Sequence, residues 1–180
     1  MRSLVPDKTN YLKNIKAILF DIDGVLTDGS ITIDSNGDEI KSFNVKDGQL
    51  IEFMQFHSFI FGAISGRSSL ALISRLNEMN VDFHRLGVRN KITALEEFAN
   101  FYKLDLENIA YIGDDIIDIE VMQNVGWSFA PADASVHVLN IAKTITFSKG
   151  GKGVLREVIE MIILENNEIK VNFNNFFKIY

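Results

Sequence analysis

The sequence predicts an α/β fold: a Rossmann-like, doubly wound parallel sheet with helices on both faces. Short apolar runs without polar alternation recur along the chain, as expected of strands that are buried on both faces of a parallel sheet. Segments with helical spacing of apolar residues separate these runs, and the β-α-β-α order is typical of α/β folds. Of the 180 residues, 47% are hydrophobic. We therefore expect one domain over 1–180, with its core at about 14–165 and a C-terminal tail at 166–180.

Composition limits the function classes. No apolar segment approaches the ~20 residues that cross a bilayer, and the first ten residues lack the order of a signal peptide. The chain has no Cys, which excludes thiolate metal sites and fits a reducing cytoplasm. The net charge of −6 argues against a nucleic-acid surface. We expect a cytoplasmic protein without a membrane or nucleic-acid partner, and an acidic protein that handles phosphate must gather its cations locally or use a metal.

The first predicted strand, at 17–20, ends in two acids, Asp21 and Asp23, and Gly24 then begins a polar turn. Open α/β sheets bind ligands at the carboxyl ends of their strands. Two carboxylates this close repel each other unless a hard cation such as Mg²⁺ holds them. Taken alone, a D-x-D pair after an apolar run favours an acidic turn after a core strand, but the motif here is longer, DIDGVLTDG.

Residues 30–43 predict a β-hairpin, because alternating segments flank Asn36-Gly37. Placed directly after the Asp21 turn, the hairpin would project over it as a flap, or would form an ordinary meander. A helical pattern follows at 50–56, and Asp47 is a plausible N-cap that accepts from backbone donors near Leu50.

The second predicted strand, at 58–65, ends in Ser65, Gly66 and Arg67 before a predicted helix at 68–79. The Ser65 hydroxyl can donate to a phosphate oxygen there, or simply cap the helix. The third strand, at 81–86, leads to Lys91, which opens a predicted helix at 92–103. A cation is unfavourable at the positive end of a helix, and a phosphate between the two would remove the conflict, although a solvated surface lysine is the ordinary alternative.

The fourth predicted strand, at 109–112, ends in three acids within five residues: Asp114, Asp115 and Asp118. Such a cluster is an unusual start for a helix. Short strands at 127–130 and 144–147, around a helix near 134–142, complete the predicted sheet.

These four motifs, in order and each at a strand end, resemble those of the haloacid dehalogenase superfamily of phosphotransferases. The resemblance implies that Asp21 is the nucleophile and Asp23 the general acid/base, with an aspartyl-phosphate intermediate. The full implied catalytic set is Asp21, Asp23, Ser65 and Lys91. The implied Mg²⁺ ligands are Asp21, the backbone carbonyl of Asp23, and Asp114, supported by Asp115 and Asp118.

The spacing of the motifs leaves no room for a cap domain. The interval from Asp21 to Ser65 holds the hairpin and one helix, and the interval from Ser65 to Asp114 holds two helices and a strand. A capless phosphatase accepts bulky substrates or closes its site with another subunit.

A closer resemblance covers about 14–165: the chain is similar to capless 3-deoxy-D-manno-octulosonate 8-phosphate phosphatases and their sialic-acid-type relatives. It rests on the segments DGVLTDG, FNVKDG, SGR, GVRNK, GDD and GGKGVLRE, and on the hairpin. It implies Mg²⁺-dependent hydrolysis of a sugar acid phosphate, in lipopolysaccharide precursor synthesis, by a homotetramer whose hairpin reaches a neighbour's active site. The implied substrate contacts are Asp23, Asn44, Val45, Lys46, Asp47, Gly48, Gly66, Arg67, Arg75 and Lys91.

Two positions depart from the pattern of these families. Relatives that act on nine-carbon acids tend to carry an acid where Arg67 stands, which favours the eight-carbon substrate. Leu86 stands where the family usually has Gln. A phosphatase of a nine-carbon nonulosonate 9-phosphate or another sugar phosphate, and a non-catalytic binding homologue, remain the alternatives.

Overall fold

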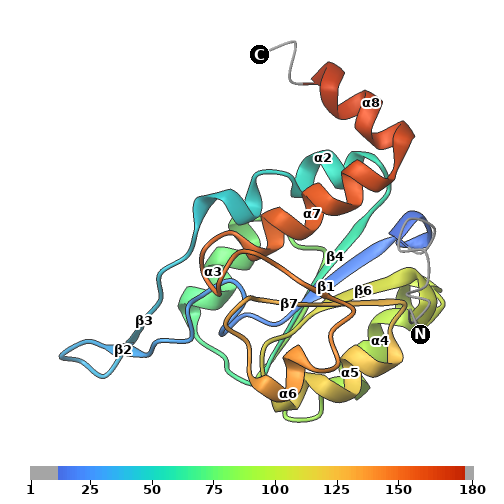
Figure 1. Cartoon of the computed structure of the whole chain (residues 1–180). Helices are drawn as coiled ribbons and strands as arrows, with labels where there is room; N and C mark the ends of the chain where they lie inside the picture. Colours follow the sequence, from blue (N-terminus) through green and yellow to red (C-terminus); the bar gives the residue numbers. More distant parts are fainter. Residues whose placement is uncertain (1–11, 177–180) are drawn as a thin grey trace.

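A six-stranded, fully parallel sheet forms the centre of the computed structural model, which describes residues 12–176 (Figure 1). The strand order is β5-β4-β1-β6-β7-β8. The strands are β1 (Ala17–Phe20), β4 (Ile60–Ser65), β5 (Phe83–Leu86), β6 (Ile109–Ile112), β7 (Trp127–Ala130) and β8 (Thr144–Ile145). The predicted fold class is confirmed.

Strand β1 lies between β4 and β6 and is buried on both faces. Because side chains alternate along a strand, Ile18 and Phe20 enter one core while Ala17 and Leu19 enter the other. Each large apolar side chain buried in this way contributes roughly 1.5–3 kcal/mol relative to an exposed one. The continuous apolar run of β1 therefore follows from its central position.

Helices cover both faces of the sheet. One core contains residues of α2 (Ile51–Phe56), α3 (Leu70–Glu78), α7 (Val154–Glu165) and α8 (Asn167–Phe176). The other contains residues of α4 (Lys91–Tyr102), α5 (Ile119–Asn124) and α6 (Val136–Leu139). Within the predicted tail, α8 contributes Ile169 to the first core, where the side chain is 4% exposed.

Several elements are shorter than the sequence predicts. Helix α6 covers only part of the predicted 134–142, and β8 ends at Ile145 instead of 147. The reason for the second difference is visible: the Glu157 carboxylate accepts from the backbone N–H groups of Phe147 and Ser148, at 2.8 Å each. These groups are therefore not free to extend the sheet. At the start of the described residues, η1 (Leu12–Asn14) is a 3-10 helix.

The hairpin, β2 (Thr32–Ile33) and β3 (Glu39–Ile40), forms a separate two-stranded sheet and projects from the body of the molecule (Figure 1). Gly37 adopts a φ of +88°, which the turn requires and which glycine adopts without strain. The projecting arrangement agrees with a flap and not with a meander of the main sheet. Three of its isoleucines are more than half exposed: Ile31, Ile33 and Ile40.

No cap domain interrupts the described part of the chain. Between β1 and β4 lie the hairpin, η2 (Val45–Gly48) and α2, and between β4 and β6 lie α3, β5, α4 and η3 (Leu106–Asn108). Among the described residues, no helix combines the length and the apolar character that crossing a membrane requires.

Candidate active site

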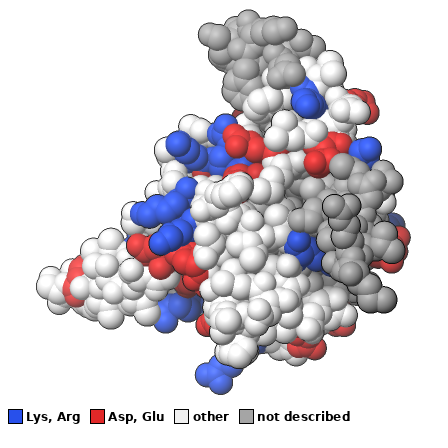
Figure 2. All heavy atoms as spheres, viewed as in Figure 1, with Lys and Arg blue, Asp and Glu red and all other residues white. Residues whose placement is uncertain are grey.

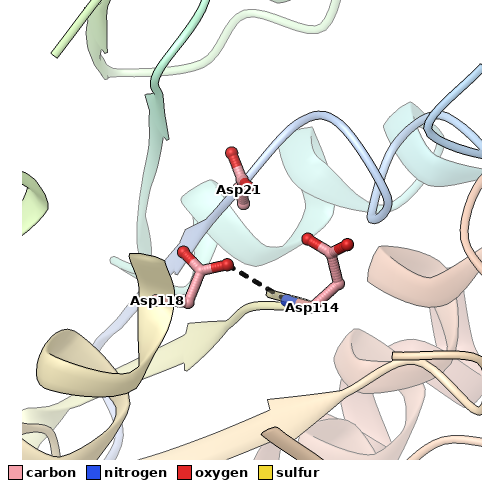
Figure 3. A group of neighbouring side chains, drawn as sticks. All are labelled: Asp21, Asp114 and Asp118. Carbon is pink, nitrogen blue, oxygen red and sulfur yellow. Dashed lines mark hydrogen bonds between the residues drawn. The ribbon is translucent and has the colours of Figure 1, made fainter. Parts of the chain in front are cut away.

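Three carboxyl groups converge at the carboxyl ends of β1 and β6 (Figure 3). Asp21 directly follows β1, Asp114 follows β6, and Asp118 closes η4 (Ile116–Asp118). One oxygen of each side chain lies within 4.8 Å of one oxygen of the other two. The adjacency of β1 and β6 in the sheet brings together acids that lie far apart in the sequence.

Asp21 is held from two sides. Its Oδ1 accepts from the backbone N–H of Ile22 at 2.7 Å, and its Oδ2 lies 2.8 Å from Lys91 Nζ. Burial and the nearby charge of Asp118 raise the pKa of Asp21 from 3.8 to about 7, against the opposing effect of Lys91. The carboxylate is thus fixed in place in a poorly solvated position.

Lys91 is the first residue of α4, and its side chain is fully buried. Its Nζ also lies 2.7 Å from Asp118 Oδ1. Burial acts to lower the pKa of Lys91, but the charges of Asp21 and Asp118 outweigh it, and the pKa is raised above 10.5. The carboxylates therefore resolve the conflict between this cation and the positive helix end.

Asp118 has no oxygen to spare. Its Oδ1 accepts from Lys91 Nζ and from the Tyr111 hydroxyl, at 2.7 and 2.6 Å. Its Oδ2 accepts from the backbone N–H groups of Asp114 and Asp115, at 3.1 and 3.3 Å. Asp118 therefore holds Lys91 and the backbone of Asp114 in place. Asp115, by contrast, is exposed and caps η4 by accepting from Ile116 N at 2.8 Å.

Of the three clustered carboxyl groups, Asp114 is the one that is not fully hydrogen-bonded. Within residues 12–176, its buried Oδ1 has no hydrogen-bond partner. Burial and the charges of Asp21 and Asp118 raise its pKa from 3.8 to about 8. A Cβ at Gly24 would lie 2.0 Å from Asp114 Oδ2, so only glycine leaves room for this carboxylate beside the first turn. Hard oxygen donors, an unpaired buried oxygen and mutual repulsion are the features that a divalent cation would satisfy.

Asp23 and Ser65 lie beside this cluster. Asp23 Oδ1 pairs with Lys41 Nζ and accepts from Thr27 Oγ1 at 3.3 Å. Ser65 is 1% exposed, and its Oγ accepts from the backbone N–H of Arg67 at 3.1 Å. This contact leaves the Ser65 hydroxyl proton free to be donated to a ligand.

The expectation that Asp47 caps the helix that follows it is wrong. Asp47 is 1% exposed, and its Oδ1 accepts from the backbone N–H of Arg156, at 3.1 Å, in the first turn of α7. Burial raises the pKa of Asp47 to about 6, against the effect of the Arg156 and Leu155 backbone N–H groups. The loop before α7 closes on the site as well, since a Cβ at Gly150 would lie 2.3 Å from Gly24 O.

Three other predicted substrate contacts, Asn44, Val45 and Lys46, precede or belong to η2, and within the single chain they do not contact the clustered acids. Asn44 caps η2 by accepting from Lys46 N at 3.0 Å, and Val45 is exposed. Lys46 lines an open groove of about 380 Å³, which it shares with Arg156 and Glu160 and which contains none of the clustered acids. Figure 2 shows this mixture of Lys and Arg with Asp and Glu between the hairpin and α7.

Two arginines connect the predicted substrate-binding segments. Arg67, half exposed and next to the exposed Gly66, lies 3.0 Å from Glu39 of the hairpin. Arg75 is mostly buried and donates to Asn44 O at 3.0 Å, with its guanidinium 5.9 Å from the Phe43 ring centre. Gly48 keeps this packing close, since a Cβ there would lie 3.1 Å from Met79. Arg75 therefore supports the loop, and its contact with substrate stays a prediction.

Sequence reasoning missed three residues at the site: Lys41, Thr27 and Tyr111. Tyr111 lies within an apolar strand, and no sequence signal shows that its hydroxyl reaches Asp118. Thr27 lies inside the first motif. Lys41 lies in the alternating sequence segment 39–43, just after β3, and in such a segment a lysine is expected to face solvent.

Comparisons with known proteins agree with this geometry. Residues 58–158 match the haloacid dehalogenase-like hydrolase family. The chain is 39% identical over 152 residues to the 3-deoxy-D-manno-octulosonate 8-phosphate phosphatase of Haemophilus influenzae, and the match covers 84% of each protein. The crystal structure of the phosphatase of that name from Yersinia pestis has a TM-score of 0.87 at 36% identity, covering 90% of this chain and 88% of the other.

A third relative carries ligands. The 3-deoxy-D-manno-octulosonate 8-phosphate phosphatase of Moraxella catarrhalis was solved with a magnesium ion, a phosphate ion and a KDO molecule. It has a TM-score of 0.89 at 31% identity, with coverage of 93% of this chain and 97% of the other. The fold and the acidic site thus define a haloacid dehalogenase-like hydrolase, and the chain belongs to that family. Within the family it is a phosphoric monoester hydrolase similar to the 3-deoxy-D-manno-octulosonate 8-phosphate phosphatases.

Proposed function

We propose that this protein is a Mg²⁺-dependent phosphatase that hydrolyses 3-deoxy-D-manno-octulosonate 8-phosphate in lipopolysaccharide precursor synthesis. The observation that carries the proposal is the Asp21 carboxylate, fixed at the end of β1 beside Lys91 and the half-buried Asp114. Relatives that the chain matches over most of its length are named for this sugar acid phosphate.

In the proposed reaction, Asp21 and Asp23 have different roles. An Asp21 oxygen attacks phosphorus in line, the bond to the sugar oxygen breaks, and Asp23 gives that oxygen its proton. Asp23 then takes a proton from water as the water attacks phosphorus, which frees inorganic phosphate and restores Asp21. In this mechanism Lys91 and the Ser65 hydroxyl balance charge on the transferring group.

Asp21, Asp114 and the Asp23 backbone carbonyl are the groups that would hold Mg²⁺. When bound, the ion supplies positive charge that offsets the repulsion of the carboxylates and of the phosphate oxygens. Asp118 supports this set through Lys91 and through the backbone N–H group of Asp114.

The substrate carries both a phosphate and a carboxylate, and Arg67 supplies a cation suited to the carboxylate. Turnover of eight-carbon and nine-carbon sugar acid phosphates, measured side by side, separates the proposal from its alternative. A higher kcat/KM for a nonulosonate 9-phosphate would assign the nine-carbon substrate instead.

The nucleophile provides the direct test. Asp21→Asn is expected to abolish Mg²⁺-dependent phosphate release while the circular dichroism spectrum stays that of the wild type. The reason is that an amide neither attacks phosphorus nor offsets the charge of the metal. Turnover above about one percent of wild type would contradict the assignment, since removal of an enzyme's nucleophile can cost several orders of magnitude in kcat.

We also propose that the active form is a homo-oligomer, a tetramer, in which the hairpin completes a neighbour's site. The hairpin leaves three isoleucines exposed, and Lys46 lies away from the acids of its own chain. An open site also exposes the aspartyl-phosphate to bulk water, which weakens every electrostatic contact.

Replacing Ile31, Ile33 and Ile40 together by Ser is expected to lower both the sedimentation mass and the turnover, because the apolar docking surface is lost. Phe101→Ser, at an exposed phenylalanine of α4, is the matched control and should change neither. A fully active monomer at assay concentration would overturn the oligomer proposal.

A further inference from the structure

A lysine from the stem of the hairpin reaches into the site. The Lys41 side chain is 1% exposed, and its Nζ pairs with Asp23 Oδ1 and with Glu39 Oε1, the latter at 3.1 Å. Lysine is almost never fully buried unless its charge is paired. Glu39 Oε1 also lies 3.0 Å from Arg67, so the ion pairs form a chain from Arg67 to Asp23.

The contacts of Asp23 are unevenly divided between its two oxygens. Oδ1 receives both Lys41 Nζ and Thr27 Oγ1. Oδ2 is buried and, within the described part of the chain, accepts no hydrogen bond. One oxygen is thus anchored, and the other is left available for proton transfer.

We propose that Lys41 is a positioning residue for catalysis. Its ammonium group fixes the Asp23 carboxyl so that Oδ2 meets first the leaving oxygen of the substrate and then the attacking water. This inference rests on the proposed function, because it takes Asp23 as the general acid/base. Misplacement of a catalytic group by about 1 Å can cost about 10²-fold in rate, so one ion pair from the hairpin is enough to matter.

A purely structural role for Lys41 makes a different prediction. If Lys41 only anchored the hairpin, its loss would slow all substrates alike. If it positions Asp23, its loss should slow only substrates whose leaving oxygen needs a proton. A sugar alkoxide is strongly basic and needs one, whereas p-nitrophenolate is a weak base and leaves without help.

The experiment compares kcat/KM for 3-deoxy-D-manno-octulosonate 8-phosphate and for p-nitrophenyl phosphate, since kcat/KM reports on formation of the aspartyl-phosphate without its hydrolysis. In Lys41→Met we expect a loss of about 10- to 100-fold for the sugar phosphate. This is at most the lower end of the roughly 10²–10⁴-fold contribution of general acid catalysis, because Asp23 is displaced but still present. The loss for p-nitrophenyl phosphate should stay below about threefold. Lys13→Met, at an exposed lysine of η1, is the matched control and should leave both values unchanged.

A double-mutant cycle provides the second readout. In an Asp23→Asn background, Lys41→Met should cause no further loss for the sugar phosphate, because the group that it positions is already disabled. Circular dichroism checks that each variant folds. If Lys41→Met does not fold, Lys41→Gln takes its place. Its loss in kcat/KM should be smaller than that expected of Lys41→Met, but again greater for the sugar phosphate than for p-nitrophenyl phosphate.

The outcomes separate the two proposals. Equal losses for both substrates, or additive losses in the double mutant, would overturn the role of Lys41 while the phosphatase stands. A wild type that hydrolyses neither compound, or an Asp23→Asn variant with full activity on the sugar phosphate, would instead overturn the proposed function.

Discussion

Asp114 is half-buried beside two other carboxyl groups, and both the partial burial and the neighbouring charges raise its pKa, to about 8. In the absence of a cation, this residue weakens the fold that holds it. Such a loss of stability is typical of functional sites, where perturbed pKa values cluster. The unpaired Oδ1 that destabilises the metal-free fold is also the atom that would bind a metal ion.

Asp114→Ala is therefore expected to act in opposite directions on activity and on stability. The Mg²⁺ concentration for half-maximal phosphate release should rise at least tenfold, about 1.4 kcal/mol of lost binding, or activity should vanish. In EDTA, the melting temperature should stay the same or rise, because a repulsive buried carboxyl is gone. A Mg²⁺ titration and a melting curve measure the two effects.

Asp105→Ala provides the matched control, because Asp105 is exposed and precedes β6 at the opposite end of the sheet. It should change neither quantity. Unchanged Mg²⁺ dependence in Asp114→Ala would remove Asp114 from the set of metal ligands.

The role of a single site residue can be predicted from the sequence when the residue is unfavourable in its local structure and therefore needs a partner. Lys91 opens a helix, where a cation is unfavourable, and this conflict by itself indicates a negative partner. Tyr111 and Lys41 carry no such conflict. Their roles depend on the turn that brings Asp118 back over β6, and on the path of the hairpin stem.

Among the elements, α7 shows how a helix end is completed from a distance. The residue before α7 is Gly153, at a φ of +95°, and it has no side chain with which to cap. Asp47, from η2, supplies the acceptor. Capping rules are local and therefore favour the neighbouring helix for Asp47, whereas the packing of α7 on η2 does not follow from residue spacing.

Two substitutions separate the hydrogen bond of Asp47 from its charge. Asp47→Ala should lower the free energy of unfolding by about 0.5–2 kcal/mol, the range for a lost cap. Asp47→Asn keeps an oxygen acceptor and removes a charge whose burial raises the pKa to about 6, so it should cost less than Asp47→Ala. Urea unfolding at pH 7 measures both, and a larger loss in Asp47→Asn would show that the charge itself stabilises the fold.

For the molecule as a whole, the raised pKa values of Asp21 and Asp114 set how stability depends on pH. Between pH 3.8 and about 8, the folded state binds more protons at these groups than the unfolded state does. Without a metal, the contribution of these groups to the free energy of unfolding therefore falls as the pH rises through this window. A cation that binds the ionised carboxylates restores stability by mass action.

We expect the melting temperature in EDTA to decrease from pH 5 to pH 8. The increase on addition of Mg²⁺ should be larger at pH 8 than at pH 6, because more of the carboxyl groups are ionised at the higher pH. Scanning calorimetry at both pH values measures this. In Asp114→Asn, the Mg²⁺-induced increase in melting temperature should differ less between pH 6 and pH 8 than in the wild type. An unchanged difference would contradict the linkage between metal binding and ionisation of Asp114.

The central strands are predictable because burial on both faces leaves a continuous apolar run, as in β1 and β6. Element ends are less predictable, since they depend on long-range hydrogen bonds such as those from Phe147 and Ser148 to Glu157. Helix α8 escapes prediction for a related reason: its first core contact, Ile169, is surrounded by polar residues in the sequence.

The position of β1 in the sheet has a consequence for the synthesis of the chain. This strand leaves the ribosome before both of its partners, which begin only at Ile60 and Ile109. Pairing between segments so far apart in sequence is slow, and until it happens an apolar strand stays without neighbours and prone to aggregation. The loop that closes over Gly24 comes later still, at Gly150. Asp21 is thus translated well before the loop at Gly150 that encloses its neighbour Gly24.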